Sequence, residues 1–449
     1  MTHLPDTALR MRWLDLAAAE RDPVIAAERD ALIRRGAVAD PSVRETVRAI
    51  LAELRGNPDE GLRAASVRYG GGLADGRLLL EPAELRSARD RLAPGVRAAL
   101  DQAIGNVRRF AESQVPATTV TKIAPGIEIE RRWLPLQRVG VYVPGGTAAY
   151  PSSLVMGVVP AQVAGVDDVV VASPAGRDGS LNPVLLGAAG LLEVDRFLVA
   201  GGAQAIGALA FGLPETGLAA VDRVVGPGNA WVTAAKIELV GEIGIDLPAG
   251  PSEGMVLADA GADPVRVAAD LITQAEHGPD SPAILVTPDR LLAEAVAAEI
   301  ARQLPEAGRR QILEQALATH GRIVLAADLD AAIAFVNAYA PEHLSVDVRP
   351  LDVTVRRVRN AGSIFVGPWA PESAGDYATG ANHVLPTGGL ARSCSPLSVE
   401  LFGKYSQVQR ISREGLAGIR STVVTLAAAE GLDAHAAAIE VRFRRGSSW

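Results

Sequence analysis

Four of the six histidines in this chain lie in short polar stretches beside carboxylate or amide side chains. These stretches are Gln274-Ala-Glu-His277, Glu342-His343, Asp376 to His383, and Glu430 to His435. Imidazole nitrogens and carboxylate oxygens bind divalent metal ions such as Zn²⁺, and the same groups transfer protons in acid–base catalysis. A chain that uses little histidine and places most of it beside such groups is predicted to contain a metal site or an acid–base centre.

The first stretch is predicted to end a helix that spans 264–277. Gln274 and His277 are three residues apart and therefore share one face of that helix. Gly278-Pro279 is a strong signal for the end of a helix, and the negative end of the helix dipole favours a cation nearby. The same pattern is also typical of a surface helix end that binds nothing.

Asp376 and His383 flank a loop that follows a predicted strand at 363–366. Because α/β proteins hold their sites in loops at the carboxyl ends of parallel strands, we expect both side chains at such an edge. The alternative is a turn stabilised by the Asp376 side chain, with His383 exposed to solvent.

Glu430 and His435 lie on either side of Gly431, which interrupts the last helical segment. Asp433 is predicted to cap the final helix, so His435 falls in its first turn. The positive end of a helix disfavours imidazolium, and a metal ligand must be a neutral imidazole. A surface capping segment would explain the same residues without a metal.

Glu342 and His343 follow Pro341, so their backbone is expected to be turn-like. A Glu and a His that face one pocket could activate a water molecule and move a proton. Neighbouring side chains usually point apart, so this pair indicates catalysis only in combination with other residues.

Composition restricts the class of protein. A hydrophobic content of 48% with 21% charged residues is typical of a globular chain. The net charge of −8 argues against nucleic acid or an anionic membrane as partner, because both require a basic surface. Cys394 is the only cysteine, which excludes an intrachain disulfide and a cysteine-rich zinc site. Neither a signal peptide nor an apolar run of about 18 residues is present, so we expect a soluble, cytoplasmic protein.

Short apolar strands alternate with helices in two successive parts of the chain. Strands are predicted at 139–143, 169–172, 196–200 and 223–225, and the alternation restarts with 254–258, 283–287, 322–325, 344–348 and 363–366. This order predicts parallel βαβ units with right-handed crossovers, in two modules divided near 248–253. Residues 1–130 and the segment after about 395 are expected to be mostly helical.

Glycine-rich turns follow three of the predicted strands, at 143–146, 200–204 and 226–229. Backbone amides and helix N-termini at such turns bind phosphates, so three of them in one crevice would admit a nucleotide. Alternatively, the glycines only allow tight turns between strand and helix.

Together these motifs resemble one family, the histidinol dehydrogenases, which are zinc enzymes that end histidine biosynthesis. The resemblance covers about residues 130–440 and preserves the family's motif order. It is carried by the segments at 139–146, 201–206, 226–230, 248–253, 274–277, 341–344 and 375–387, and by Glu430 and His435. Each motif alone is weakly specific, whereas the complete ordered set is highly specific.

The resemblance implies a role for each matching position. The ligands of one Zn²⁺ per subunit would be Gln274, His277, Asp376 and His435, and the catalytic pair would be Glu342 and His343. The substrate would contact Ser252, His383 and Glu430 as well as His343 and the metal ligands, and NAD would contact Tyr142, Gln204 and Asn229.

The resemblance also implies an α/β fold with two Rossmann-like modules, in which parallel or mixed sheets are flanked by helices, and an intertwined homodimer. The expected domains are an N-terminal helical arm (1–35), a catalytic domain (36–130 plus 249–390), a NAD-binding domain (131–248) and a C-terminal helical tail (391–449). In that dimer, Glu430 and His435 of the tail would form part of the active site of the partner subunit.

The implied activity is the oxidation of L-histidinol to L-histidine through the aldehyde, with two NAD⁺. His343 would take the hydroxyl proton, Glu342 would activate water, and zinc would mainly orient the small-molecule substrate. One alternative is a paralogue that oxidises another small alcohol, such as a sulfonated diol; another is a nucleotide-binding regulatory protein without catalysis. The presence of His383, Glu430 and the intact Glu342-His343 pair favours the first reading.

Overall fold

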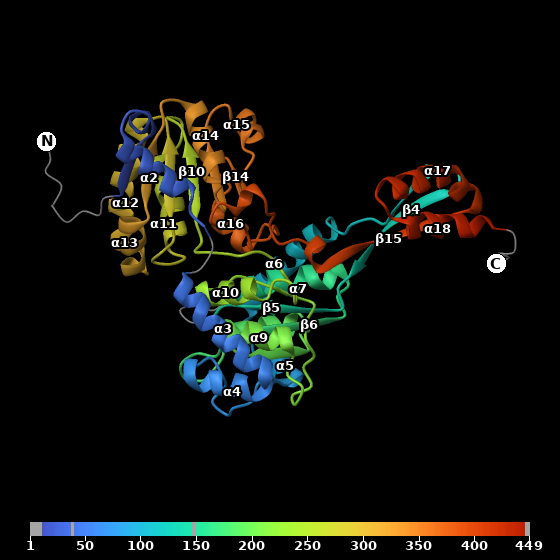
Figure 1. Ribbon diagram of the computed structural model, residues 1–449. Helices are drawn as coiled ribbons and strands as arrows, with labels where there is room; N and C mark the ends of the chain where they lie inside the picture. The colour runs from blue at the N-terminus through green and yellow to red at the C-terminus, as the bar shows by residue number, and fades with distance from the viewer. Residues whose placement is uncertain (1–10, 37–39, 146–149, 445–449) are drawn as a thin grey trace. The chain divides into compact units, whose positions relative to one another are not determined.

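The computed structural model describes residues 11–36, 40–145 and 150–444. Two compact units are distinguished by their internal contacts. The first comprises the chain up to Gln114 together with Leu136–Phe402, and the second comprises Val115–Pro135 with the chain from Gly403 onward. The first unit contains two α/β modules, each built on its own sheet, as Figure 1 shows.

The sheet of the first module has the strand order β2-β7-β6-β5-β8-β9. Its strands are β2 (Leu79–Leu80), β5 (Arg138–Tyr142), β6 (Asp168–Ser173), β7 (Arg196–Val199), β8 (Arg223–Val225) and β9 (Gly244–Ile245). All pairs are parallel except β2 with β7. The central strand β5 is buried on both faces from Val139 onward, as the run of valines in this part of the chain predicts.

The helices that cover this sheet lie between residues 41 and 238. They are α3 (Pro41–Gly56), α4 (Pro58–Tyr69), α5 (Pro82–Asp90), α6 (Pro94–Glu112), α7 (Pro151–Ala164), α8 (Pro183–Leu191), α9 (Gly202–Phe211) and α10 (Ala230–Glu238). In Figure 1 the blue α3 lies beside the green α9 and α10, and the three helices are in contact.

The position of α3 corrects the expectation that residues 36–130 group with 249–390. Ile50 and Leu54 of α3 join one core cluster with Leu198 and Leu209 of the first module. β2 also pairs with β7 of the same sheet. The amphipathic face of α3 specifies that it packs on a sheet, but its sequence does not say which of the two sheets it covers.

The second module has a wholly parallel sheet with the order β1-β12-β11-β10-β13-β14. Its strands are β1 (Arg12–Asp15), β10 (Gly254–Ala258), β11 (Ala283–Thr287), β12 (Arg322–Leu325), β13 (His343–Asp347) and β14 (Ser363–Val366). Its helices include α2 (Pro23–Ile33), α11 (Pro264–Ala275), α12 (Arg290–Gln303), α13 (Arg310–Thr319), α14 (Leu329–Tyr339), α15 (Leu351–Arg357) and α16 (Glu372–Tyr377). The expected N-terminal helical arm therefore contains an edge strand, β1, in addition to helices.

Both sheets are doubly wound around a central strand. The chain adds β6 and β7 on one side of β5 and β8 and β9 on the other, and it does the same around β10. The crevice between β5 and β8 is thus a topological switch point, where α/β proteins bind ligands. The two modules predicted from the alternation of strands and helices are confirmed.

The second unit is a small antiparallel sheet with two helices. The sheet has the order β15-β4-β3, from β3 (Thr119–Ala124), β4 (Ile127–Pro135) and β15 (Gly403–Ile411), and the helices are α17 (Arg413–Ala429) and α18 (Asp433–Glu440). The expectation of a mostly helical C-terminal segment is wrong at β15, which pairs with β4 along its full length. Here a distant partner strand, rather than local periodicity, determines the conformation.

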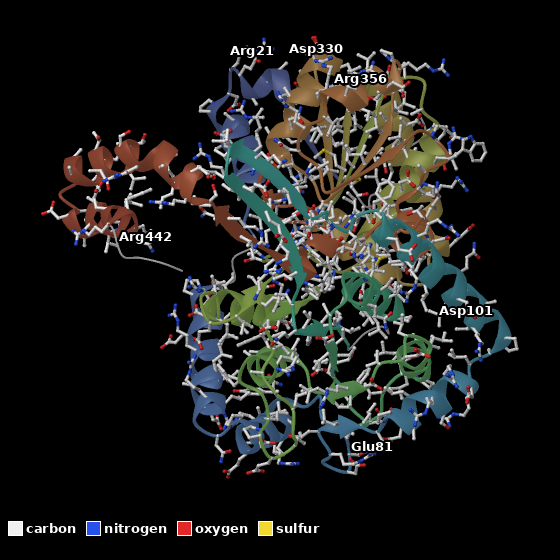
Figure 2. All side chains as sticks on the ribbon, turned by 90° about the vertical axis from the view of Figure 1, so that its right-hand side faces the viewer. Arg21, Glu81, Asp101, Asp330, Arg356 and Arg442 are labelled. Carbon is white, nitrogen blue, oxygen red and sulfur yellow. The ribbon has the colours of Figure 1, made fainter. Side chains whose placement is uncertain are left out.

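Charged side chains such as Arg21, Glu81 and Asp330 project from the surface, as Figure 2 shows. Within the described part of the chain, we find no helix long and apolar enough to cross a bilayer.

The packing of α3 on the first module can be tested by truncating its buried side chain. Leu54 is fully buried, so we expect Leu54→Ala to lower the free energy of unfolding by about 2–5 kcal/mol. Val67 on α4 is 89% exposed, and Val67→Ala should change this free energy by less than about 0.5 kcal/mol. Urea unfolding of the two variants measures the difference, and equal values would contradict the assigned packing.

Candidate active site

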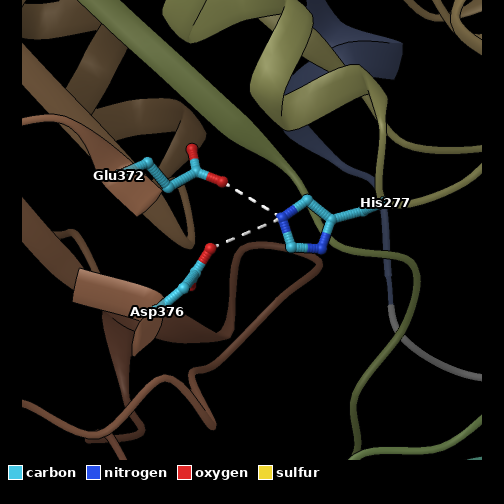
Figure 3. Close-up of side chains that lie close together, drawn as sticks. All are labelled: His277, Glu372 and Asp376. Atoms are coloured by element: carbon cyan, nitrogen blue, oxygen red, sulfur yellow. Dashed lines mark hydrogen bonds and ion pairs between the residues drawn. The ribbon is translucent and has the colours of Figure 1, made fainter. Parts of the chain in front are cut away.

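Three side chains that could bind a metal ion meet between α11 and α16. His277 Nε2 lies 3.2 Å from Glu372 Oε1 and 3.9 Å from Asp376 Oδ2, as Figure 3 shows. All three ligand atoms fall within 4.8 Å of one another. The two carboxylates are buried, whereas the His277 side chain keeps 34% of its surface exposed. An imidazole and two carboxylates at this spacing form an N/O set of the kind that Zn²⁺ accepts.

Gln274 adds an unusual amide to this group. Its side chain is 1% exposed, and its Oε1 atom has no hydrogen-bond partner, while its nitrogen donates to Ser252 Oγ at 3.3 Å. A buried oxygen without a partner is costly unless something else binds it. The orphaned amide oxygen therefore fits a metal ligand. α11 ends at Ala275, slightly earlier than predicted, with Glu276 as its C-cap, and His277 is the next residue.

The adjacent Glu342 and His343 face the same interior space. The exposed fractions of their side chains are 8% and 4%, and His343 Nδ1 lies 3.7 Å from Glu342 Oε2 and 3.7 Å from Glu372 Oε1. Glu342 Oε2 accepts hydrogen bonds from Ser252 Oγ and from the backbone N–H of Glu253, both at 2.8 Å. Neither ring nitrogen of His343 has a hydrogen-bond partner. The two side chains therefore lie close together in the interior, although they are neighbours in the sequence.

Burial and mutual charge perturb the acid–base properties of this pair. Desolvation raises the pKa of Glu342 to about 7. Burial alone would lower the pKa of His343, but the carboxylates of Glu342 and Glu372 outweigh it and raise that pKa. A carboxylic acid with a pKa near neutrality is suited to general base catalysis.

The metal-ligand cluster is perturbed in the same way. Desolvation acts to lower the pKa of His277, but the hydrogen bond and charge of Glu372 raise it to about 9. Burial and the neighbouring Glu372 raise the pKa of Asp376. Because a metal ligand must be deprotonated, binding at this cluster has to release the His277 proton.

His383 connects the cluster to the first module. Its Nδ1 lies 2.9 Å from the backbone oxygen of Asp376, and its Nε2 lies 3.2 Å from Ser153 Oγ on α7. Burial lowers its pKa, so the ring is neutral at pH 7. The neighbouring Asn382 donates to the backbone oxygen of Met156, also on α7. The segment after α16 thus holds the two modules against each other beside the site.

The site occupies the amino ends of the strands of the second module, contrary to the expectation of a carboxyl-end loop. Glu342 directly precedes β13, and Ser252 and Glu253 precede β10. Asp376 follows the carboxyl end of β14 but lies in α16, which contacts α11. The helix that follows a parallel strand runs back toward the amino edge of the sheet. The expectation of a carboxyl-end site did not take this reversal of direction into account.

The predicted nucleotide-binding residues gather at the carboxyl edge of the first module. Tyr142 ends β5, and its hydroxyl accepts a hydrogen bond from Gly202 N at 3.2 Å. Gln204 is buried in the first turn of α9. Asn229 caps α10 with its side-chain oxygen, which accepts from two backbone amides of that helix. Gly226 has φ +114°, and a Cβ there would lie 2.0 Å from the Tyr142 carbonyl oxygen, so only glycine fits. Gly146, the last residue of the first glycine-rich turn, lies outside the described residues.

Glu430 and His435 belong to the second unit. Glu430 is the C-cap of α17, His435 lies in the first turn of α18, and both are exposed. Asp433 is the first residue of α18 and makes no capping hydrogen bond, so the predicted cap is off by one residue.

Glu372 is a site residue that the sequence analysis missed. It is 4% exposed and faces both His277 and His343. Its spacing from Asp376 was the available signal, because residues four apart share one face of a helix. Because the sequence analysis did not predict a helix at α16, it had no reason to place Glu372 and Asp376 on one face.

A nucleotide-type crevice on one Rossmann-like module, with a buried Glu–His pair and metal-ligand side chains on the other, defines a metal-assisted α/β enzyme. A family model described as histidinol dehydrogenase matches residues 33–443. The histidinol dehydrogenase of Leifsonia xyli subsp. xyli is 46% identical over 90% of this chain and 94% of that protein. For the protein of the same name from Halobacterium salinarum the identity is 45%, over 92% and 96%. The crystal structure of histidinol dehydrogenase from Elizabethkingia anophelis superposes with a TM-score of 0.89 and 33% identity, over 98% of this chain and 99% of that one.

The chain therefore belongs to the histidinol dehydrogenase family, whose members are NAD- and zinc-dependent oxidoreductases. The α/β fold with a parallel and a mixed sheet flanked by helices is the fold of that family.

The raised pKa of Glu342 should be visible in the pH dependence of stability. An acid whose pKa rises from 4.5 to about 7 on folding holds its proton more tightly in the folded state. Its contribution to stability therefore falls as the pH rises from about 4.5 to about 7 and is constant above. We expect Glu342→Gln to gain stability relative to the wild type across this window, by up to about 3 kcal/mol.

Urea unfolding at pH 5 and pH 8, with a chelator present, measures this gain. The control is Glu306→Gln, at an exposed position, which should show the pH dependence of the wild type. A difference between Glu342→Gln and wild type that does not change with pH would contradict the assigned burial cost.

Proposed function

We propose that this protein oxidises L-histidinol to L-histidine through L-histidinaldehyde, the last step of histidine biosynthesis. One observation carries the proposal: the buried Glu342–His343 pair, with unpartnered ring nitrogens, lies beside the His277–Asp376 cluster. Membership of the histidinol dehydrogenase family supports the same reaction.

In this proposal, one Zn²⁺ per subunit is held by Gln274, His277 and Asp376 of one subunit and by His435 of the partner subunit. The orphaned Gln274 Oε1 and the proximity of His277 to Asp376 support three of these ligands. When bound, Zn²⁺ holds the imidazole and amine of the substrate, and two NAD⁺ in turn accept the hydrides. Ser252, His383 and Glu430 complete the proposed substrate contacts.

His343 acts in the first oxidation and Glu342 in the second. His343 Nδ1 faces the carboxylates of Glu342 and Glu372, which leaves Nε2 to receive the hydroxyl proton as the alcohol becomes the aldehyde. Both hydrogen bonds to Glu342 fall on Oε2, which leaves Oε1 to take a proton from water. The resulting hydroxide adds to the aldehyde carbon, and the hydrate then loses its hydride to give the acid.

The crevice at the carboxyl ends of β5 and β8 is proposed as the NAD site, with contacts from Tyr142, Gln204 and Asn229. The switch point and the close approach of Gly226 to Tyr142 support this placement. The module of 131–248 would thus bind NAD and the segment 249–390 would supply the catalytic groups. The enzyme would work in the cytoplasm.

We further propose an intertwined homodimer in which Glu430 and His435 complete the site of the partner subunit. Both residues are exposed and belong to the second unit, so their side chains are available to another chain. Glu430 would contact the substrate imidazole, and His435 would be the fourth zinc ligand.

The activity itself is tested by NADH formation from purified protein and L-histidinol. Zinc-loaded protein should form two NADH per histidinol, because alcohol and aldehyde are oxidised in turn. Removal of the metal with a chelator should abolish turnover, and added Zn²⁺ should restore it, because the neutral Gln274 is a weak ligand. Full activity without any bound divalent ion would refute the zinc site, and absence of NADH from the zinc-loaded protein would refute the reaction.

The shared site is tested by mixing two inactive variants, His435→Ala and His343→Ala. A mixed dimer contains one site with both histidines intact and one with neither, so random exchange should restore about a quarter of the wild-type activity. Each variant alone is the control. If labelled subunits exchange but no activity returns, the site is not shared between subunits.

A further inference from the structure

Arg35, just beyond the end of α2, forms a partly buried clamp on Glu253, which in turn is hydrogen-bonded to Glu342. Its Nε and Nη2 donate to the two oxygens of Glu253 at 2.6 and 2.5 Å. Its guanidinium carbon lies over the ring of Tyr339, 3.2 Å from the centroid. The side chains of Arg35 and Glu253 are 16% and 4% exposed. A bidentate, stacked arginine of this kind fixes its partners in orientation as well as distance.

One end of the clamp fixes the segment that holds Glu342. The backbone N–H of Glu253, whose side chain pairs with Arg35, donates to Glu342 Oε2 at 2.8 Å. Ser252, the preceding residue, donates its hydroxyl to the same oxygen. A shift of the 252–253 segment would therefore move both hydrogen-bond donors of the carboxylate.

The other end fixes the turn that delivers Glu342 to the site. Arg35 Nη1 donates to the backbone oxygen of Tyr339 at 2.7 Å, and Nη2 reaches that of Ala340 at 3.4 Å. Ala340 has φ +56°, a conformation that a residue with a Cβ rarely adopts without outside support. Glu342 follows this turn by two residues, so Arg35 contacts both segments that determine where its carboxylate lies.

We propose that Arg35 is a positioning residue for Glu342, so that the N-terminal segment governs the aldehyde-to-acid step. This inference rests on the proposed function and on the division of work between Glu342 and His343. The backbone of His343 is fixed in β13, where it pairs in register with Gly254 of β10 and its N–H donates to the backbone oxygen of Glu253. Unlike the Glu342 carboxylate, the His343 ring makes no hydrogen bond to the 252–253 segment. Loss of the clamp should therefore displace the water-activating carboxylate more than the imidazole.

The test compares the two half-reactions in single-turnover NADH formation, from L-histidinol and from L-histidinaldehyde. Because removal of one partner from a buried ion pair can prevent folding, the main variant is the double substitution Arg35→Met/Glu253→Gln, which leaves no unpaired charge. Arg35→Lys is the second variant, since lysine keeps the charge but cannot form the bidentate clamp.

The matched control is Arg55→Met/Glu242→Gln. Arg55 pairs bidentately with Glu242 and lies 4.8 Å from the Phe211 ring centroid, so it repeats the same chemistry away from the site. We expect the control to keep both half-reactions. The Arg35 variants should lose about tenfold to a hundredfold in aldehyde oxidation and less than about threefold in the alcohol step, the scale expected for a misplaced catalytic group.

A double-mutant cycle with Glu342→Gln decides whether Arg35 acts through Glu342. If it does, Arg35→Met/Glu253→Gln should add no further loss in the aldehyde step once Glu342 is replaced. Equal losses in both half-reactions, or a full additional loss in the Glu342→Gln background, would overturn the inference. Wild-type protein that forms no NADH from either substrate would instead refute the proposed function.

Discussion

Burial of several carboxylates beside two imidazoles is the constraint on which the site depends. Glu342, Glu372 and Asp376 lie in the protein interior, where an isolated negative charge is strongly disfavoured. Burial raises the pKa values of Glu342 and Asp376, and the neighbouring carboxylates raise the pKa values of His277 and His343. A divalent cation at His277 would reduce the cost of holding these negative charges in the interior. This arrangement of buried carboxylates therefore suits a site that holds a positive ion and a cationic substrate.

The fold meets this constraint by bringing short segments from several elements to one edge. Gln274 and His277 come from the end of α11 and the turn after it, Glu342 and His343 from the start of β13, and Glu372 and Asp376 from α16. Rigid strands fix these segments, because β10 and β13 are hydrogen-bonded neighbours at the switch point of their sheet. The first module is held to these segments through His383 and Asn382, and its own switch point between β5 and β8 belongs to the same unit.

The sequence predicted the regular part of this fold well. Strands such as β8, β10, β11, β12 and β14 have the predicted bounds, because buried parallel strands are short apolar runs with clear ends. The failures have a common cause, namely partners distant in the sequence. β15 is a strand because β4 pairs with it, and α3 covers the first sheet because Leu198 and Leu209 receive its side chains. Glu372 was missed because only the helix α16 relates it to Asp376.

Strand β1, the first strand among the described residues, pairs with β12 in the register Arg12 to Arg322. During synthesis the first module has all of its strands once β9 has left the ribosome, whereas β1 has no partner strand until β12 emerges and the second sheet is complete only after β14. Long-range parallel pairing of this kind is slow to form. The two modules therefore complete their sheets at different stages of translation. β1 and α2 remain without their partners for most of that time, and they are the segments that a chaperone would have to protect.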